Sequence, residues 1–542
     1  MTTKNIAIIG GGASGVGLVW AMSQAYKRGW NNEDWSITLI HSGARLGGHS
    51  DTVSERIDGQ VRDLDLGVQV IASAMYPTVM TMLAHPDFAD IVLDPVELKI
   101  ACAFPDDQGG SRYWGNFDAY QNTELYKLGE KDCATFEQLM KEVVQLKDLI
   151  EAALTLEEFL EIHAEKFDDL DFFKQYFLDP YMSIVNGYGQ ALLSEVLVLD
   201  VIPLFDFGLG AFTHETSGFA RFRDGAGSWV QKMATLATEA LGGRLTIELD
   251  TEVEQLYSGV NGPTVVTGGT TRSFDYIVST VDMFTNSKLM SGHEGWEVFK
   301  PFIGDTTEYG TTVWDLQPGF CYLHQDEGVL APGLPGPPAE TLQFTAPATP
   351  KGQDYDLTRS YTTYIESNLL GIPTPPAGDQ FYLTMYGFDP STSQPTPVPS
   401  KGIKFHRNWV HGMWLPTFMV EQKLKFHQAQ GISPHTPALH SQHGTGLFFA
   451  GNNLTMDSEE GALLSGFAVA KYLFGFDPML ALLPDDLSKH DWEMWFAAKG
   501  LYTLLYELMF APSVLADPGA GPVVDKLFAG LLSLLGRRAE GT

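Results

Sequence analysis

The sequence predicts an α/β fold in which a Rossmann-like dinucleotide-binding domain is interrupted by an inserted α+β domain and by helical segments. Three observations support this prediction. An apolar run at residues 6–9 leads into a glycine-rich loop and then into a helix-compatible run at 16–26. A strand is expected at residues 245–254, and further strand-like segments alternate with turns up to residue 280. A last apolar segment at 446–452 precedes a helix that starts near residue 459.

The first element is the glycine loop, in which Gly10, Gly12 and Gly15 satisfy the pattern G-x-G-x-x-G. The first glycine allows a tight turn, the second lets the backbone approach a pyrophosphate, and the third lets the helix pack closely on the strand. Ser14 lies in the same loop, at the start of the helix. Helix N-termini favour phosphate groups because their N–H groups are unpaired and their dipole end is positive. The loop therefore predicts dinucleotide binding.

The second element is the end of the next strand, where such domains usually have an acid that binds the ribose hydroxyls. Here the strand predicted at residues 36–40 is followed by His41. Glu33 and Asp34 precede this strand and would lie at its other end. We therefore expect His41 to hydrogen-bond the ribose. The alternative is an ordinary histidine at a strand end.

Two further motifs follow, Arg45-Leu46-Gly47-Gly48-His49-Ser50 and Asp65-Leu66-Gly67. With these motifs in this order, the sequence resembles flavoproteins of the amine oxidase and phytoene desaturase branch. The Gly-Gly-His-Ser variant is most similar to a bacterial, polyunsaturated fatty acid isomerase-like subgroup associated with fatty-acid modification. The resemblance implies a glutathione reductase-like domain that holds FAD along its whole length. It implies FAD contacts at Arg45, Gly47, Gly48, His49, Gly67, Val68, Gln69 and Val70.

Later segments resemble the same family. The backbone of Val253 matches the position that meets adenine, and the last strand closes in Gly451 and Asn452. The resemblance implies that the following helix faces the flavin N1 and C2 carbonyl, where negative charge develops on reduction. Its contacts are expected at Glu460, Gly461 and Ala462.

Two positions depart from the family pattern, because His41 and Asn452 stand where the family has acids. An amide can still donate and accept hydrogen bonds, so we expect an altered affinity for FAD and not its loss. Covalent attachment needs a cysteine upstream of the final strand. Cys321 is too distant for this role, so FAD is expected to be non-covalent.

The composition excludes several classes of partner. The 542 residues include 34 Lys+Arg and 67 Asp+Glu, which gives a net charge of −33. This charge argues against nucleic acid and against adhesion to anionic lipid. We expect no signal peptide, because the first residues lack its pattern, and no membrane-spanning helix, because no run reaches about 18 apolar residues. Because the three cysteines are far apart, we expect a reducing, cytoplasmic location.

The motifs divide the chain into six segments. FAD-binding parts are expected at 1–90, 216–290 and 441–480, a mainly helical insertion and substrate region at 91–215, a substrate-domain sheet with loops at 291–440, and amphipathic helices at 481–542. The last segment could pack on the body of the protein or make peripheral contact with lipid. The oligomeric state is left open.

No catalytic side chain is predicted beyond the flavin. The alternation at residues 405–416 could bring Trp409 near the flavin, and His406 and His411 are either catalytic or ordinary polar strand residues. No metal site is expected, because the loop histidines have no accompanying ligand cluster. These histidines are His435, His440 and His443.

The leading hypothesis is an FAD-dependent oxidoreductase or a flavin-assisted double-bond isomerase. It would transfer a hydride from an apolar, fatty-acid-like small molecule to flavin N5. An amine oxidase is the alternative enzyme, because it shares every cofactor motif. A third hypothesis, from another class, is a non-catalytic flavin-bound partner or scaffold of a lipid enzyme.

Overall fold

A computed structural model describes most of the chain. The described residues are 3–30, 34–73, 75–106, 109–146, 151, 154–185, 193, 196, 198, 201, 212, 216–259, 262–293, 296–297, 300, 316–332, 340–348, 355–372, 379–392, 396–412, 446–452, 458–483, 495 and 498–499. The loop with His435, His440 and His443 and nearly all of the helices expected at 481–542 lie outside this set.

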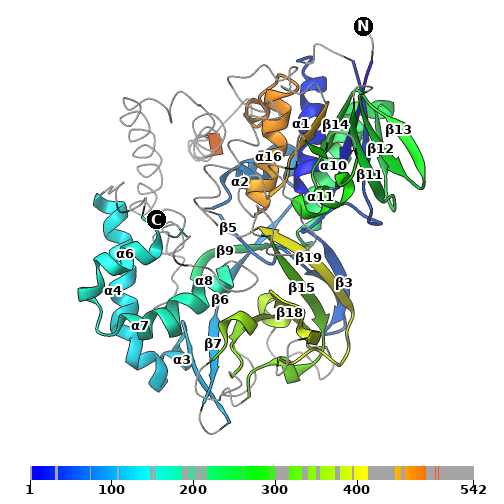
Figure 1. Ribbon diagram of the computed structural model, residues 1–542. Coiled ribbons are helices and arrows are strands. Elements are labelled where there is room, and N and C mark those ends of the chain that lie inside the picture. Colours follow the sequence, from blue (N-terminus) through cyan, green and yellow to red (C-terminus); the bar gives the residue numbers. More distant parts are fainter. Residues whose placement is uncertain are drawn as a thin grey trace.

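A five-stranded parallel sheet forms the centre of the dinucleotide-binding domain (Figure 1). Its order is β10 (Leu245–Glu248), β2 (Trp35–Ile40), β1 (Lys4–Ile9), β14 (Tyr276–Ser279) and β20 (Leu447–Phe449). Ile6 and Ile8 pack into the core on one face, and Ala7 and Ile9 pack into the core on the other. Because both faces are buried, the strand appears in the sequence as an uninterrupted apolar run.

Helices cover one face of this sheet, namely α1 (Ala13–Lys27), α10 (Gly227–Leu241) and α16 (Glu459–Tyr472). The helix α11 (Met283–Met290) and an antiparallel meander lie on the other face. The meander consists of β11 (Val253–Gly259), β12 (Gly262–Thr267) and β13 (Thr270–Ser273). The described part of α16 packs against α1, where a Cβ at Gly466 would lie 2.4 Å from the carbonyl oxygen of Ser14.

The single strand expected near residues 245–254 is in fact two strands in different sheets. β10 pairs in parallel with β2, whereas β11 pairs with β12 in the meander. Asp250 lies between them with a φ of 49°. A residue in this left-handed region cannot continue a strand, so the chain turns there.

A seven-stranded sheet forms the second body of the molecule. Its strands, in spatial order, are β19 (Phe405–Gly412), β15 (Leu316–His324), β18 (Tyr382–Tyr386), β17 (Tyr361–Ile365), β16 (Leu342–Thr345), β7 (Ile100–Pro105) and β8 (Ser111–Gly115). Two of these strands, β7 and β8, come from the segment expected to be mainly helical. β7 is recruited because it pairs in parallel with β16, more than 200 residues away in the chain.

The helical segment packs against this sheet through a large aromatic core that includes Phe104, Tyr176 and Phe177. Its helices are α3 (Asp118–Gln121), α4 (Glu124–Leu146), α6 (Leu156–Ile162), α7 (Leu170–Phe173) and α8 (Asp179–Val185), with a π-helical turn at Lys174–Leu178. These helices lie in the segment at 91–215 that we expected to be mainly helical. No helix in the described ranges is long and apolar enough to cross a membrane.

Two small sheets connect the two bodies. The hairpin of β3 (Thr52–Ile57) and β4 (Gln60–Asp65) packs through Leu64 and the adjacent Leu66 on the large sheet. The second small sheet contains β5 (Ile71–Ala72), β9 (Thr216–Phe222) and β6 (Leu93–Leu98). The remaining helices used below are α2 (Pro77–Ala84), α13 (Glu366–Leu369) and α17 (Pro478–Ala481). The Asp-Leu-Gly motif therefore lies at the junction of the two bodies.

Candidate functional site

The candidate site lies where the strand order of the parallel sheet reverses. From β1, helix α1 leads to β2 on one side, and β14 lies on the other side. Ligands of such sheets bind in the crevice outside the carboxyl ends of the strands at this switch point. The residues that follow these carboxyl ends are Gly10 after β1, His41 after β2, Thr280 after β14 and Gly451 shortly after β20. Segments far apart in the sequence thus meet along one edge.

The glycine loop forms a tight cradle with unused donors. Gly10 has a φ of 107°, and a Cβ at Gly15 would lie 2.1 Å from the Gly10 carbonyl oxygen. No described side chain caps the N-terminus of α1, and its first turn carries no acid. The Ser14 hydroxyl is buried there without a hydrogen-bond partner among the described residues. Such an uncapped, uncharged N-terminus fits a phosphate group.

The second and third motifs continue this cradle through backbone contacts. The N–H of Gly47 donates to the carbonyl of Gly11 at 2.8 Å, and a Cβ at Gly48 would lie 2.9 Å from the Cα of Gly12. The N–H of Val68 then donates to the carbonyl of His49 at 3.3 Å. An unbroken backbone path therefore runs from the glycine loop to the segment that contains Val68, Gln69 and Val70.

His41 lies at the predicted strand end and supports the glycine loop. Its Nδ1 accepts a hydrogen bond from the N–H of Gly11 at 3.3 Å. Burial lowers the pKa of His41, although a hydrogen bond with the backbone of Arg45 opposes this effect. The ring is therefore neutral at pH 7, and it joins the glycine loop to the Arg45 loop. The ribose contact expected for His41 stays a prediction.

Arg45 forms an ion pair within the chain. Its Nη2 lies 2.6 Å from Oδ1 of Asp51, and Nη1 of Arg407 lies 2.9 Å from Oδ2 of the same carboxylate. Two guanidinium groups thus share one carboxylate, which leaves a net positive charge beside Gly47 and Gly48. Arg407 was missed by the sequence reasoning, although the strand that carries it had been singled out.

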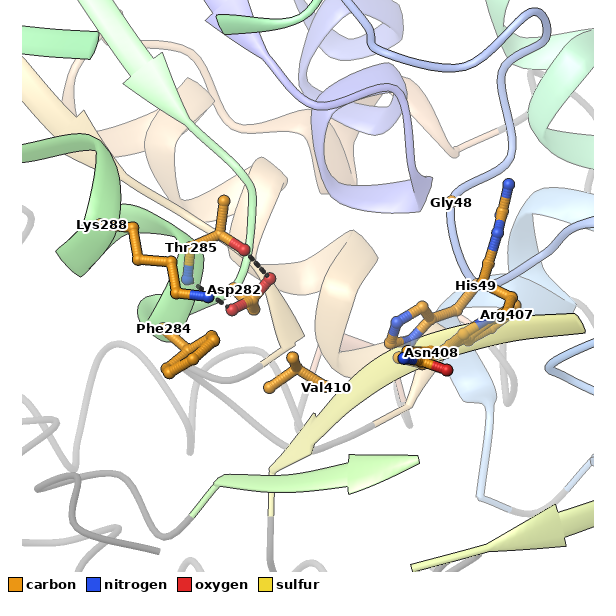
Figure 2. Close-up of a pocket in the computed structure, with 10 residues that line it drawn as sticks. Gly48, His49, Asp282, Phe284, Thr285, Lys288, Arg407, Asn408 and Val410 are labelled. Carbon is orange, nitrogen blue, oxygen red and sulfur yellow. Dashed lines mark hydrogen bonds between the residues drawn. The ribbon is translucent and has the colours of Figure 1, made fainter. Parts of the chain in front are cut away.

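A cavity of about 320 Å³ opens beside Gly48, between α11 and β19 (Figure 2). It is lined by Gly48, His49, Asp282, Phe284, Thr285, Lys288, Arg407, Asn408, Trp409 and Val410. The Nζ of Lys288 lies 3.8 Å from the centre of the Phe284 ring. Asp282 caps α11 by accepting from the N–H of Thr285 at 2.8 Å. The residues of α11 had no motif that could have revealed them.

Trp409 lies beside the Asp-Leu-Gly motif, and its expected position near the flavin stays a prediction. A Cβ at Gly67 would lie 2.2 Å from the Trp409 ring, so only glycine fits there. His49 stacks on Trp409 with ring centres 4.4 Å apart and on His411 at 4.9 Å. His406 instead stacks on Tyr322, at 4.2 Å. Of the two candidate histidines, His411 therefore lies nearer to the cavity wall.

The start of α16 is tied into the site by its own side chains. Ser458 accepts from the N–H of Gly461 at 3.0 Å, and Ser465 accepts from the N–H of Gly451 at 2.7 Å. Ala462 lies in the first turn of this helix, and Asn452 directly follows Gly451. These residues lie at the carboxyl edge of the sheet, as does Val253 at the start of β11.

The two acids of α16 point into the protein. Glu460 accepts from the N–H groups of Thr78 at 2.8 Å and Val79 at 3.0 Å, so it caps α2. Glu459 accepts from the hydroxyl of Ser50 and, at 3.4 Å, from the indole of Trp229. Burial raises the pKa of Glu459 to about 8 and that of Glu460 to about 7. The flavin contact expected for Glu460 stays a prediction.

Comparison with known families matches residues 8–86 to the NAD(P)-binding Rossmann-like domain. The chain carries a Rossmann-like dinucleotide-binding domain. No curated protein matches the sequence. The matched residues cover the glycine loop, the Arg45 loop, the hairpin of β3 and β4, and α2.

Solved structures share the fold of nearly the whole chain. A candidate protoporphyrinogen oxidase from Exiguobacterium sp. 255-15 has a TM-score of 0.53 at 12% identity, over 86% of this chain and 97% of that chain. A CLA-producing fatty acid isomerase from P. acnes has a TM-score of 0.52 at 13% identity, over 86% and 98%. An oxidoreductase from Methanosarcina mazei has a TM-score of 0.50 at 10% identity, over 86% and 100%. The fold implied by the sequence resemblance is thus confirmed. The shared fold extends over 86% of this chain, well beyond the Rossmann-like domain.

Proposed function

We propose that the protein is an FAD-dependent oxidoreductase that acts by hydride transfer on a largely apolar, fatty-acid-like substrate. The observation that carries this proposal is the backbone path from the glycine loop through Gly47 and Gly48 to the segment at 66–70. A dinucleotide pyrophosphate needs only the first part of this path. The remainder leads to the junction with the seven-stranded sheet, which suits the flavin end of FAD.

The described residues could hold FAD. The uncapped N-terminus of α1 would receive the pyrophosphate, and the net positive Arg45, Asp51 and Arg407 cluster would attract it into an acidic protein. Gly67, which has no Cβ, lets the Trp409 ring pack directly on this end of the backbone path. When bound, FAD supplies the hydride acceptor, and the protein supplies position, charge and exclusion of water.

Apolar surroundings at the junction support an apolar substrate. Val70 lies half-buried at the end of the path, beside Phe219 and Tyr364. The fold shared with a fatty acid isomerase supports the same substrate class. An oxidase or desaturase would pass the electrons to an acceptor, whereas an isomerase would return the hydride to another carbon of the substrate.

The test is to purify the protein, record its absorption spectrum, and mix it anaerobically with linoleate or with a primary amine. Flavin bands in the spectrum, together with flavin bleaching or a shifted double bond with linoleate, support the proposal. A shifted double bond without net flavin reduction identifies an isomerase. A colourless protein refutes the proposal.

The alternatives predict other results of the same experiment. Bleaching by the amine alone would refute a lipid substrate and identify an amine oxidase. A yellow protein that leaves both compounds unchanged and keeps its flavin oxidised would identify a non-catalytic flavoprotein.

A further inference from the structure

A second cavity, of about 200 Å³, lies at one end of the seven-stranded sheet, where β7 and β16 end. Among the described residues it shares none of its lining with the cavity beside Gly48. Its inner wall is buried, since Ala103 and Phe104 are each 1% exposed, whereas Gly328 and Pro332 on its rim are exposed. The cavity therefore leads from the surface into the protein and can admit a small molecule.

The strand register places this cavity on the face of the sheet that points away from the Asp-Leu-Gly motif. Thr345 pairs with Tyr361 across β16 and β17, and both residues line the cavity. The next residue, Thr362, pairs with Met385, which packs in the core that contains Leu66. Paired residues point to one face of a sheet and successive residues point to opposite faces. The cavity is therefore separate from the proposed flavin site.

The lining of the cavity is apolar and uncharged. It consists mainly of prolines, alanines, Leu330 and two aromatic residues, and no charged residue lines it within the described part of the chain. An ion would lose its water here without compensation. A dry apolar cavity of about 150 Å³ is large enough to bind benzene. The lining and the volume therefore suit a neutral molecule with about one aromatic ring.

Buried polar atoms at the cavity indicate that this molecule has a hydroxyl group. Thr345 is 8% exposed, and its hydroxyl has no hydrogen-bond partner among the described residues. The neighbouring hydroxyl of Tyr361 donates to the carbonyl of Val329 at 2.7 Å, so its proton is not available to Thr345.

Gln343 lies two residues earlier on the same face, and its Nε2 also has no partner among the described residues. The Oε1 of Gln343 accepts from the N–H of Ala331 at 3.1 Å, so only the donor end of this amide is unused. Because buried polar groups are costly to leave unpaired, a ligand hydroxyl that both donates and accepts would be favoured at this wall.

We propose that this cavity binds a small neutral phenol, whose hydroxyl donates to Thr345 and whose ring fills the apolar space. The site is additional to the proposed flavin reaction and does not depend on it. Its ligand differs in chemical class from the substrate proposed above, because it carries neither a charge nor a long chain.

The experiment is a titration of the purified full-length protein with 4-fluorophenol, followed by ¹⁹F NMR, with fluorobenzene as the analogue that lacks the hydroxyl. A ligand of this size is expected to have a Kd of about 1 mM. Thr345→Val keeps the shape of the side chain and removes one hydrogen bond, so it should weaken 4-fluorophenol binding roughly two- to tenfold. The same variant should bind fluorobenzene at least as tightly as the wild type.

The matched control is Thr362→Val, one strand away. Thr362 is 5% exposed and points to the opposite face, so this substitution should leave the affinity for 4-fluorophenol unchanged. A second variant covers the case in which Thr345→Val does not fold. Leu330→Trp changes a half-buried residue of the lining and should fill part of the cavity, which should weaken the binding of both compounds at least roughly tenfold.

Three results would overturn the proposal. The first is a wild-type protein with no saturable binding of 4-fluorophenol, which would mean that the cavity holds only solvent. The second is equal affinity for 4-fluorophenol in Thr345→Val and Thr362→Val, or in Leu330→Trp and the wild type. The third is displacement of 4-fluorophenol by excess FAD, which would place the compound in the dinucleotide site. None of these results bears on whether the protein binds FAD.

Discussion

The buried acid Glu459 should make the stability of the protein fall as the pH rises. Glu459 is 3% exposed, and burial raises its pKa from 4.5 to about 8. Because its folded pKa lies above its unfolded pKa, its contribution to stability is fully present below pH 4.5 and is lost as the pH rises through 8. Between pH 5 and pH 8 this loss amounts to about 3 kcal/mol in the free energy of unfolding, from the shift in pKa alone.

Replacing Glu459 by Gln should remove this loss. The amide keeps an acceptor for the hydroxyl of Ser50 and the indole of Trp229, as the protonated acid does, but it cannot ionise. Relative to the wild type, Glu459→Gln should therefore gain about 3 kcal/mol on going from pH 5 to pH 8. The comparison cancels the part of the substitution that does not depend on pH.

The assay is urea unfolding followed by tryptophan fluorescence at pH 5, 6, 7 and 8. The control is Glu239→Gln on the exposed side of α10, which should follow the pH dependence of the wild type. If Glu459→Gln differs from the wild type by the same free energy at pH 5 and at pH 8, Glu459 does not have a raised pKa and the reasoning is refuted.

Three further substitutions test the site. Gly15→Ala would place a Cβ 2.1 Å from a backbone oxygen of the glycine loop, so the FAD content of the purified protein should fall at least roughly tenfold. Gly243→Ala, with nothing within 4 Å of the new Cβ, should retain FAD, and equal FAD contents would contradict the tight turn. His41→Ala removes the acceptor of a loop N–H and should raise the FAD released on ultrafiltration, measured by its fluorescence; unchanged retention would exclude a role for His41. Trp409→Ala removes a ring that is 3% exposed and should lower the free energy of unfolding, measured by urea unfolding, by roughly 3–5 kcal/mol. A loss below about 1 kcal/mol would show that the ring is not part of the core.

The dinucleotide-binding half was predictable because its signals are local. The buried strand, the glycine turn and the start of α1 form consecutive residues, and Gly15 is required by its contact with Gly10 within that unit. The break at Asp250 was missed because aspartate is compatible with several backbone conformations. Its left-handed conformation becomes necessary only when β10 joins β2 and β11 joins the meander.

The polar groups of the site were harder to predict than its glycines. Nothing near Lys288 or Arg407 in the sequence indicates that α11 and β19 meet at one cavity. The sequence around Glu459 likewise indicates only the start of a helix and not the burial of its side chain. Its contacts with Ser50 and Trp229 join residues that lie hundreds of positions apart, and its raised pKa is a consequence of that burial.

By itself, the sequence determined the Rossmann-like strand, loop and helix, the strongly acidic net charge, and the order of motifs that implies FAD. These features depend on neighbouring residues or on totals over the chain. Only the tertiary structure decided that Arg45 shares Asp51 with Arg407 and that Trp409 covers Gly67. The physical reason is that burial and electrostatic pairing are properties of surfaces brought together by folding, and no local pattern in the chain specifies which surfaces will meet.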